Sequence, residues 1–557
     1  MALRDDRRLR ILPGRARRPR RFRPGPLPAP AGRHPIRAER TDRRLQLGAL
    51  TTRIPLRQFR LADAALADLG AGRPSPATLG LLRRAQLSRN LLLLRQLRRS
   101  VTEKPIWYAR LAALSPQDAR TRIVDPMTGL WAAHALTTPP HGLDAPLEPV
   151  GHLLTVTCAG RELTVRLDDR SPLRHLLGLP PADPLTAAEV THWQECLEAA
   201  WRILVTRHPA AADTLAAVLR VIVPARPDPL AEGVSATSAE AFGAVAMSTP
   251  ITGTGMALAL LHETQHSVLN AVNGLFDLVE PGGAPGYSPW REDPRPASGI
   301  LHGVYAFLAV TRFWRTAIRA GGAPAGSEAE FEFARWRTAV HETAGRLLRA
   351  GEPTTGIARQ AAGEPTTGTA PQAAGEPITG EARPAAGEPT AVGTRPAAGE
   401  LTAAGRRLVG ALRDEVEPWL AEPLDPEVTR LADLARTDHH ARWRLRNLAI
   451  PAEGLKALVS AWAAERPAPA VESTVAERPR REEPHHRLRL IRARLRGDHR
   501  FPAEARETTT AAADDACLDG RWQDALTAYA TILGQDRDDA AAWSGLALVS
   551  PLPALRR

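Results

Sequence analysis

Two histidines and a glutamate stand in the pattern His-Glu-x-x-His at His262, Glu263 and His266. Residues four apart on an α-helix lie about one turn apart on the same face, so both imidazoles project from one side. Two neutral imidazole nitrogens on one face are a ligand pair that suits Zn²⁺ and ferrous iron. The pattern therefore predicts a metal site in the helical segment 256–270, MALALLHETQHSVLN.

A third protein ligand has to come from another element, with open positions left for water or substrate. His302 is the next histidine along the chain and begins an apolar helical segment, so we expect it to be the third ligand. The carboxylate alternatives in the Gly- and Pro-rich loop before it are Glu280, Glu292 and Asp293. A carboxylate ligand would make either a two-histidine, one-carboxylate iron triad or a peptidase-like zinc site.

Two chemistries remain open for such a site. In a zinc metallopeptidase, Glu263 would be the general base for a metal-bound water. In an iron oxygenase, the metal also holds a 2-oxoacid, and the far carboxylate of that cosubstrate needs a charged partner. Arg291 and Arg295 lie in the loop before His302, and a planar, bidentate guanidinium suits that role. Surface ion pairs are the alternative role for both arginines.

The positive charge of the chain is carried almost wholly by arginine. The 557 residues have a formal net charge of +12, yet the lysines are Lys104 and Lys456 alone. Residues 1–52 are rich in Arg and Pro and predict a disordered arm. No aromatic interleaving and no known nucleic-acid module accompanies this arm, so we do not expect nucleic-acid binding.

The three cysteines, Cys158, Cys196 and Cys517, are isolated, without CxxC pairing. This spacing argues against a disulfide framework, a zinc ribbon and a three-cysteine iron–sulfur motif. The N-terminus lacks an apolar stretch after its charges, and the long uncharged run at 241–261 is broken by Pro and Gly. We therefore expect a cytoplasmic protein without a membrane span or export signal.

The spacing of apolar residues predicts the helices and strands that precede the motif. From about Ile54 the period is helical and predicts two packed helices separated by a Gly-Arg-Pro-Ser-Pro break. Between 151 and 167 the period changes to two around Cys158-Ala-Gly-Arg161, which predicts a β-hairpin. A helix follows, with Thr186 and Glu189 spaced as a capping box.

Two short apolar runs, 218–223 and 241–247, predict strands that lead into the motif helix, the second of them lying along the cleft beside it. After the motif and the Gly- and Pro-rich loop, residues 300–320 and 328–349 predict two long helices. The fold class expected is α+β and mostly helical: a metal-site domain with a small β-sheet or hairpin, plus a short C-terminal α-hairpin.

Residues 351–400 repeat with a period of twelve, as in GEPTTGIARQAA and GEPTTGTAPQAA. Such units cannot bury a core, so we interpret them as a disordered insertion between residues 53–350 and 401–465 of one domain. His439 and His440, in the second part, are expected at the surface, with a role as metal ligands as the alternative.

Residues 466–507 are rich in Pro and Arg and predict a linker, and residues 508–557 resemble a tetratricopeptide repeat. One repeat cannot form a stable solenoid, so the segment is expected to dock on the main body or to contact a protein partner. The residues expected to pack its helices are Gly520, Ala525, Tyr529, Leu533 and Trp543.

Several blocks together resemble a known family. The motif run LHETQHSVLNAVNGLFDLV and the following YSPWREDPRPASGILHGVYAFLAVTRFWR are joined by LRRAQLSRNLLLLRQL, VSATSAEAFGAVAMS and DHHARWRLRN. These blocks, which span 53–447 apart from the repeats, resemble the HExxH domain associated with the modification of ribosomally made peptides. That domain also occurs fused to radical SAM/SPASM maturases, but no radical SAM cysteine motif is present here.

The resemblance implies a non-haem iron, 2-oxoglutarate-dependent peptide β-hydroxylase that acts on a ribosomally synthesised precursor peptide. In the family the motif histidines bind iron, which corresponds to His262 and His266 in this chain. The assignment of His302 as third ligand and of Arg291 or Arg295 to 2-oxoglutarate is our spatial inference added to the motif match. Glu263 would then orient a ligand or a bound water rather than act as a base.

Overall fold

Two fully buried parallel strands, β3 (Val221–Ala225) and β5 (Ala244–Ser248), form the centre of a five-stranded sheet in the order β1-β2-β3-β5-β4. Side chains alternate across a strand, so each strand contributes to two cores. Val221 and Val223 face a layer of N-terminal helices, whereas Ile222 faces the helices on the other side of the sheet. Burial on both faces explains why these strands are continuous apolar runs in the sequence.

The computed structural model describes residues 59–100, 106–137, 148–228, 233–321, 327–350, 399–464, 466, 469, 471–476, 486–497 and 508–550. The predicted arm at residues 1–52 lies outside this described part. So does nearly all of the repeat segment, residues 351–398. Within the described part, the expected fold class is confirmed: helices dominate, beside the five-stranded sheet and a two-stranded one.

The predicted β-hairpin is present as β1 (His152–Cys158) and β2 (Arg161–Leu167), which pair in antiparallel register from His152 with Leu167 to Cys158 with Arg161. The hairpin is not separate from the sheet, because β2 also pairs in parallel with β3. At the opposite edge, the two-residue strand β4 (Ser235–Ala236) pairs with β5 in antiparallel orientation.

The strand boundaries differ from those predicted. Val218 belongs to a helix, α7 (Pro209–Val218), and β3 begins only at Val221. Pro209 separates α7 from α6 (Ala187–Arg207), where the predicted capping box of Thr186 and Glu189 is confirmed. A short 3-10 helix, η1 (Arg174–Leu177), precedes α6.

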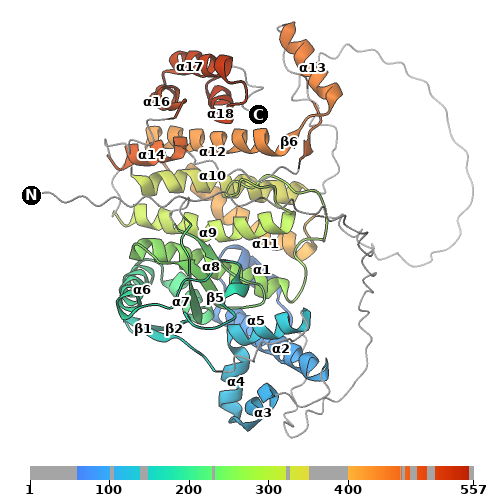
Figure 1. Ribbon diagram of the computed structural model, residues 1–557, viewed down its shortest axis with the longest axis vertical. Coiled ribbons are helices and arrows are strands. Elements are labelled where there is room, and N and C mark those ends of the chain that lie inside the picture. Colours follow the sequence, from blue (N-terminus) through green and yellow to red (C-terminus); the bar gives the residue numbers. More distant parts are fainter. Residues whose placement is uncertain are drawn as a thin grey trace, which may run out of the picture. The chain divides into compact units, whose positions relative to one another are not determined.

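Helices α8 (Gly253–Asn273), α9 (Ala297–Arg319), α10 (Glu328–Arg349) and α12 (Pro426–Asn447) pack one on the next (Figure 1). Helix α8 joins two cores. Leu260 and Leu261 pack with the sheet and α6, whereas Val268 and Leu269 pack with α9, α10 and α11 (Ala403–Val416). The His-Glu-x-x-His motif therefore lies at the junction between the sheet layer and the helical layer.

The N-terminal helices are α1 (Asp63–Gly70), α2 (Pro76–Ser100), α3 (Ile106–Ala113), α4 (Pro116–Val124) and α5 (Pro126–Thr137). The sequence predicted that the first two helices pack against each other, and this prediction is wrong. Helix α1 packs chiefly against α11, and α2 packs chiefly against α5. The apolar periodicity of a segment predicts that it is a helix. It does not predict which distant helix covers its apolar face.

The segments after the repeats pack back onto the first part, as predicted. Helix α11 contacts α1 and α10, and α12 contacts α10. The 3-10 helix η3 (Glu417–Ala421) joins α11 to α12, and after α12 come β6 (Leu448–Ala449), α13 (Ala452–Ala463) and β7 (Thr474–Val475).

The linker prediction for residues 466–507 is wrong in part, because α14 (His486–Leu495) lies within it and buries Leu490 and Ile491. The C-terminal segment forms α16 (Ala511–Leu518), α17 (Trp522–Gln535) and α18 (Ala540–Val549), and α18 packs on α12. Ala525 and Tyr529 are fully buried as expected, whereas Trp543 is 43% exposed and does not pack in the core.

No helix in the described part of the chain is long and apolar enough to cross a membrane.

Candidate metal centre

The motif lies in the middle of α8, a helix whose start is fixed by Thr252. The Thr252 side chain accepts a hydrogen bond from the Gly255 amide, which satisfies one of the free donors at the helix start. Buried apolar residues on both sides of the motif hold the helix between the two cores. The turn that carries the histidines is therefore held in place by packing at both of its ends.

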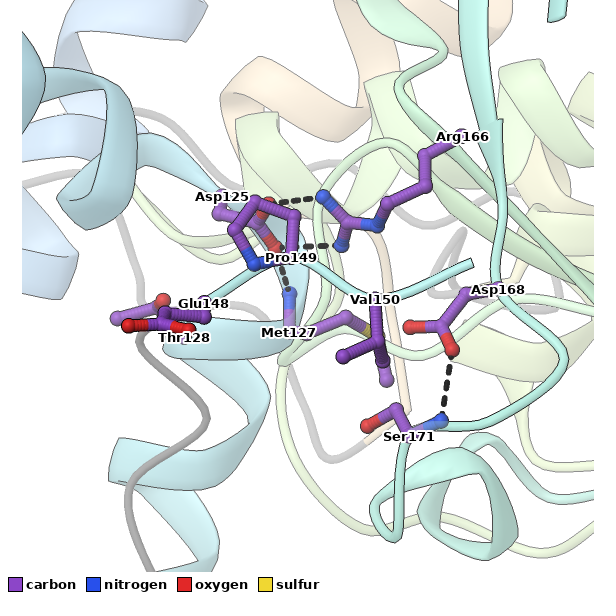
Figure 2. A pocket seen from close by; sticks show the side chains of 9 residues that line it. All are labelled: Asp125, Met127, Thr128, Glu148, Pro149, Val150, Arg166, Asp168 and Ser171. Atoms are coloured by element: carbon purple, nitrogen blue, oxygen red, sulfur yellow. Dashed lines mark hydrogen bonds and ion pairs between the residues drawn. The ribbon is translucent and has the colours of Figure 1, made fainter. Parts of the chain in front are cut away.

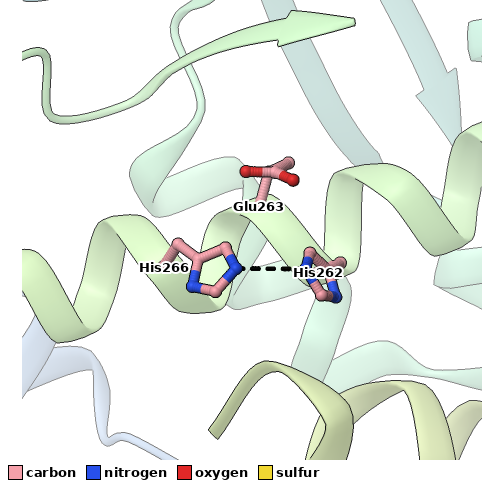
Figure 3. Close-up of side chains that lie close together, drawn as sticks. All are labelled: His262, Glu263 and His266. Atoms are coloured by element: carbon pink, nitrogen blue, oxygen red, sulfur yellow. Dashed lines mark hydrogen bonds between the residues drawn. The ribbon is translucent and has the colours of Figure 1, made fainter. Parts of the chain in front are cut away.

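His262 and His266 form the close pair that the four-residue spacing predicts. Their Nε2 atoms lie 3.0 Å apart, and their rings cross at 84°. Figure 3 shows the two imidazoles side by side, with the Glu263 carboxylate pointing to a different side of α8. Nitrogens at this separation can both reach one ion with bonds of about 2.0–2.1 Å.

The charge state of the two imidazoles also suits a metal. Burial lowers the pKa of His262 below the usual histidine value, and it lowers the pKa of His266 further. Both rings are therefore neutral at pH 7, which is the form that ligates a metal. His262 and His266 are each partly exposed.

His302, on the second turn of α9, lies beside this pair. Its ring centre is 5.6 Å from that of His266, and burial lowers its pKa to about 4. The potential ligand atoms that lie within 4.8 Å of one another belong to His262, Glu263 and His266. His302 Nε2 lies 3.3 Å from Asn273 Nδ2, so His302 would join the pair either through Nδ1 or by replacing the amide contact.

Glu263 is buried, and each of its two carboxylate oxygens accepts a hydrogen bond from a hydroxyl group. Ser235 Oγ donates a 2.7 Å hydrogen bond to Oε1, and Thr237 Oγ1 donates to Oε2. These hydroxyls come from β4 and the residue after it, so they fasten the motif helix to the edge of the sheet. Sequence reasoning missed Ser235 and Thr237, because a two-residue strand has no periodicity that could be detected.

The two arginines expected to bind 2-oxoglutarate are both hydrogen-bonded to the same carboxylate, that of Asp293 in their own loop. Arg291 Nε and Arg295 Nη1 each donate to Asp293, at 3.0 Å in both cases. Asp293, one of the carboxylate alternatives for the metal, is thereby engaged, and the two guanidinium groups lower its pKa against the effect of burial. Glu292, another alternative, pairs with Arg446 of α12.

An aromatic row leads away from the histidine pair. The Phe307 ring lies 5.4 Å from the His262 ring; Trp290 stacks on Phe307 at 5.0 Å, and Trp336 of α10 lies 4.4 Å from Phe307. The close approach of Trp290 requires glycine in α9, because a Cβ at Gly303 would lie 1.8 Å from the indole nitrogen. The loop is thereby fixed directly beside the metal centre.

The prediction that His439 and His440 are surface groups is wrong for His439, which is buried, whereas His440 keeps partial exposure. His439 is 7% exposed, and its Nδ1 lies 2.9 Å from the Tyr287 hydroxyl. The His440 ring lies 4.6 Å from the Tyr287 ring and is partly buried. Both histidines hold the loop against α12, because Tyr287 reaches from that loop into the space between α10 and α12. Their polar neighbours in the sequence gave no sign of this packing.

A small polar cavity lies at another place, between α5 and the end of β2 (Figure 2). Arg166 pairs with Asp125 at the start of α5, and Asp168 accepts a hydrogen bond from the Ser171 amide. The cavity volume of about 10 Å³ is the space of a single water. These residues join α5 to the sheet, and they make no site with His262.

No protein-family model matches this chain, and a search of curated proteins finds no match to it. The chemistry of the site is therefore inferred from its own residues. Two neutral, partly exposed imidazoles with a third beside them are a donor set that fits ferrous iron or zinc.

Proposed function

We propose that this protein is a non-haem iron, 2-oxoglutarate-dependent peptide β-hydroxylase whose substrate is a ribosomally made precursor peptide. The observation that carries the proposal is the hydrogen bonding of Glu263, whose two oxygens accept from Ser235 and Thr237. A general base of a zinc peptidase needs a carboxylate oxygen open to the metal-bound water. The Glu263 carboxylate instead points to a different side of α8 from the two imidazoles (Figure 3) and is hydrogen-bonded to the edge of the sheet, which suits a residue that positions the motif helix.

In this proposal, His262 and His266 bind the ferrous ion through neutral nitrogens, and His302 completes the set from α9. Ferrous iron, when bound, supplies the redox chemistry that converts 2-oxoglutarate and dioxygen to succinate, carbon dioxide and a hydroxyl group on the peptide. Glu263 fixes the motif turn against β4, so the imidazoles keep their direction. The resemblance in the sequence agrees with this reading, since the family motif implies the same reaction.

The aromatic row supports a peptide as substrate. Trp290 and Phe307 are partly exposed and stack on each other beside His262. Flat apolar rings exclude water and pack well against peptide side chains. A peptide laid across them would bring one residue to the metal centre.

The zinc metallopeptidase is the second candidate, because a Glu263 oxygen lies within 4.8 Å of a ring nitrogen of both histidines. The test is to purify the full chain without oxygen, to load it with Fe²⁺ or Zn²⁺, and to incubate it with peptides from a co-expressed precursor. The β-hydroxylase forms succinate and a peptide heavier by about 16 Da with Fe²⁺ and 2-oxoglutarate. Cleaved peptide with Zn²⁺ and without 2-oxoglutarate would establish the peptidase instead.

A further inference from the structure

Helix α2 carries a dense set of positive charges. It contains six arginines and no acidic residue. They are Arg83, Arg84, Arg89, Arg95, Arg98 and Arg99. One side of α2 packs against α4 and α5 in the layer of N-terminal helices (Figure 1), and the other side is open to solvent. The charges on the open side can therefore meet a partner.

Three of these arginines lie in one row on the open side of the helix. We call Arg84, Ser88, Leu92, Arg95 and Arg99 the α2 row; their spacing of three or four residues places them on one face. The arginines at both ends are exposed, Arg95 is partly exposed, and Leu92 is 51% exposed. Fifteen steps of helical rise make the row about 22 Å long.

The α2 row has no acidic partner within the described part of the chain: Arg84, Arg95 and Arg99 make no ion pair there. Arg89, on another face of α2, pairs with Glu240. Burial and the charge of Arg99, one turn away, lower the pKa of Arg95 from its usual value. Like charges at this spacing destabilise a helix, and a negatively charged partner would remove the repulsion.

The composition of the α2 row fits an acidic peptide better than a nucleic acid. A guanidinium binds a carboxylate through two parallel hydrogen bonds. Leu92, in the middle of the row, offers an apolar contact to a peptide side chain. Helix α2 contains no aromatic residue on which a nucleic-acid base could stack. An extended peptide segment of about seven residues covers the length of the row.

We propose that the α2 row binds an acidic segment of a peptide, with carboxylates on its arginines and an apolar side chain on Leu92. The proposal rests on the proposed function in one point, namely that the peptide is then a part of the precursor outside the hydroxylated residue. Helix α2 also packs on α8, which carries His262 and His266. A segment bound to α2 would raise the effective concentration of the rest of the peptide near the metal centre.

The experiment measures binding to the full chain by fluorescence anisotropy, without metal and without 2-oxoglutarate. The probes are a fluorescein-labelled peptide of four Glu-Leu-Glu units, the same peptide with Gln in place of Glu, and a labelled single-stranded DNA of twelve nucleotides. We expect the wild type to bind the Glu peptide about 10-fold or more tighter than the Gln peptide. Added salt should weaken this binding, because the charges are exposed.

The triple variant Arg84→Gln, Arg95→Gln, Arg99→Gln should weaken binding of the Glu peptide about 10-fold, the combined effect of three exposed charge pairs. Its affinity for the DNA should stay within twofold of the wild type. Its unfolding temperature should be unchanged or higher, because the repulsion between Arg95 and Arg99 is removed. A purely structural role for the row would lower the unfolding temperature instead.

The matched control is the triple variant Arg202→Gln, Arg207→Gln, Arg537→Gln, which removes the same charge at other exposed positions. It should leave the affinity for the Glu peptide within twofold. The Arg-rich residues 1–52 are the same in both triple variants, so a difference between the variants is due to α2.

The inference is overturned if both triple variants lose the same affinity, since binding would then follow the overall charge. Equal binding of the Glu and Gln peptides by the wild type would overturn it as well. A loss of DNA affinity in the α2 variant as large as the loss of peptide affinity would assign the row to nucleic acid instead. None of these measurements needs turnover, so failure of the proposed function and failure of this inference are distinguishable.

Discussion

Ser235 Oγ donates a 2.7 Å hydrogen bond to Glu263 Oε1, which joins the edge strand of the sheet to the helix that carries the metal ligands. With Thr237 on the other oxygen, Glu263 is held from two sides. The carboxylate thereby becomes part of the framework that orients His262 and His266. If Glu263 positions the helix, removing its two hydroxyl partners should have the same effect as replacing Glu263 itself. If Glu263 is a general base, the two changes should differ.

The double variant Ser235→Ala, Thr237→Val should resemble Glu263→Gln if Glu263 positions the helix. Both should retain iron after loading and lose turnover by a similar factor, about 10- to 100-fold, because residues that position metal ligands usually contribute that much. The measurement is succinate formation with parallel metal analysis. A loss for Glu263→Gln that is larger by several orders of magnitude would instead assign Glu263 as a base.

Gly303→Ala should destabilise the protein and disturb the loop beside the metal centre. The new Cβ would lie 1.8 Å from Trp290 Nε1, so the indole must move away from α9. We expect the free energy of unfolding to fall by about 1–3 kcal/mol, as in other overpacked cores. Denaturant unfolding measures it.

Gly299→Ala, in the first turn of α9, is the control for that substitution. The nearest atom to its new Cβ would be Arg295 Nε at 3.4 Å, which is an ordinary contact. Alanine has the higher helix propensity, so this variant should be equal in stability to the wild type or slightly more stable. Equal losses for the two glycines would contradict the close Trp290 contact.

The acid sensitivity of the fold should depend on His208, which stacks on Phe313 at 4.6 Å. Burial, with smaller effects of Arg207 and Arg312, lowers the pKa of His208 to about 4. The unfolded state therefore binds the proton first, and this part of the stability is present above pH 6.5 and is lost as the pH falls towards 4. The loss is on the order of 3 kcal/mol.

His208→Leu should flatten the fall in unfolding free energy between pH 6.5 and 4, because the buried titrating ring is gone. Exposed His175, replaced in the same way, is the control and should leave the slope unchanged. Urea unfolding at a series of pH values measures both slopes. An unchanged slope for His208→Leu would show that its ring is accessible to the proton in the folded protein.

The C-terminal helices should depend on Arg487 of α14. Arg487 is 5% exposed and pairs with Asp438 of α12 and with Asp514 of α16, at 2.7 Å each. Arg487→Met leaves two buried carboxylates without this partner, so the unfolding free energy should fall by about 3–5 kcal/mol. Arg494→Met, on the same helix with half-exposed partners, should lose less than about 1 kcal/mol. Similar losses in denaturant unfolding would argue against this anchoring.

The elements that depend on neighbouring residues could be predicted from the sequence. The hairpin around Cys158 to Arg161 and the capping box of Thr186 and Glu189 need only neighbouring residues, and both are present. The spacing of His262 and His266 likewise places them together on α8. Such features are set by the helix and strand periods, which can be counted in the sequence.

The remaining features depend on contacts between distant residues. The linker prediction missed α14 because its Arg487 finds Asp438 and Asp514 only in the folded chain. Ser235 and Thr237 reach Glu263 because β4 pairs with β5. A two-residue strand is too short for this pairing to be predicted from the sequence. The same limit applies to Arg291 and Arg295: the sequence shows their charge, whereas the structure shows that Asp293 holds both.

The central claim is that His262 and His266, with His302 beside them, bind one ferrous ion. The most direct measurement is the ratio of iron to protein after anaerobic loading and desalting, in the wild type, in His262→Ala, His266→Ala and His302→Ala, and in the control His175→Ala. We predict a ratio near one for the wild type and the control, and a large loss for each of the three variants with unchanged circular dichroism. Full iron binding by His262→Ala, or none by the wild type, would contradict the account.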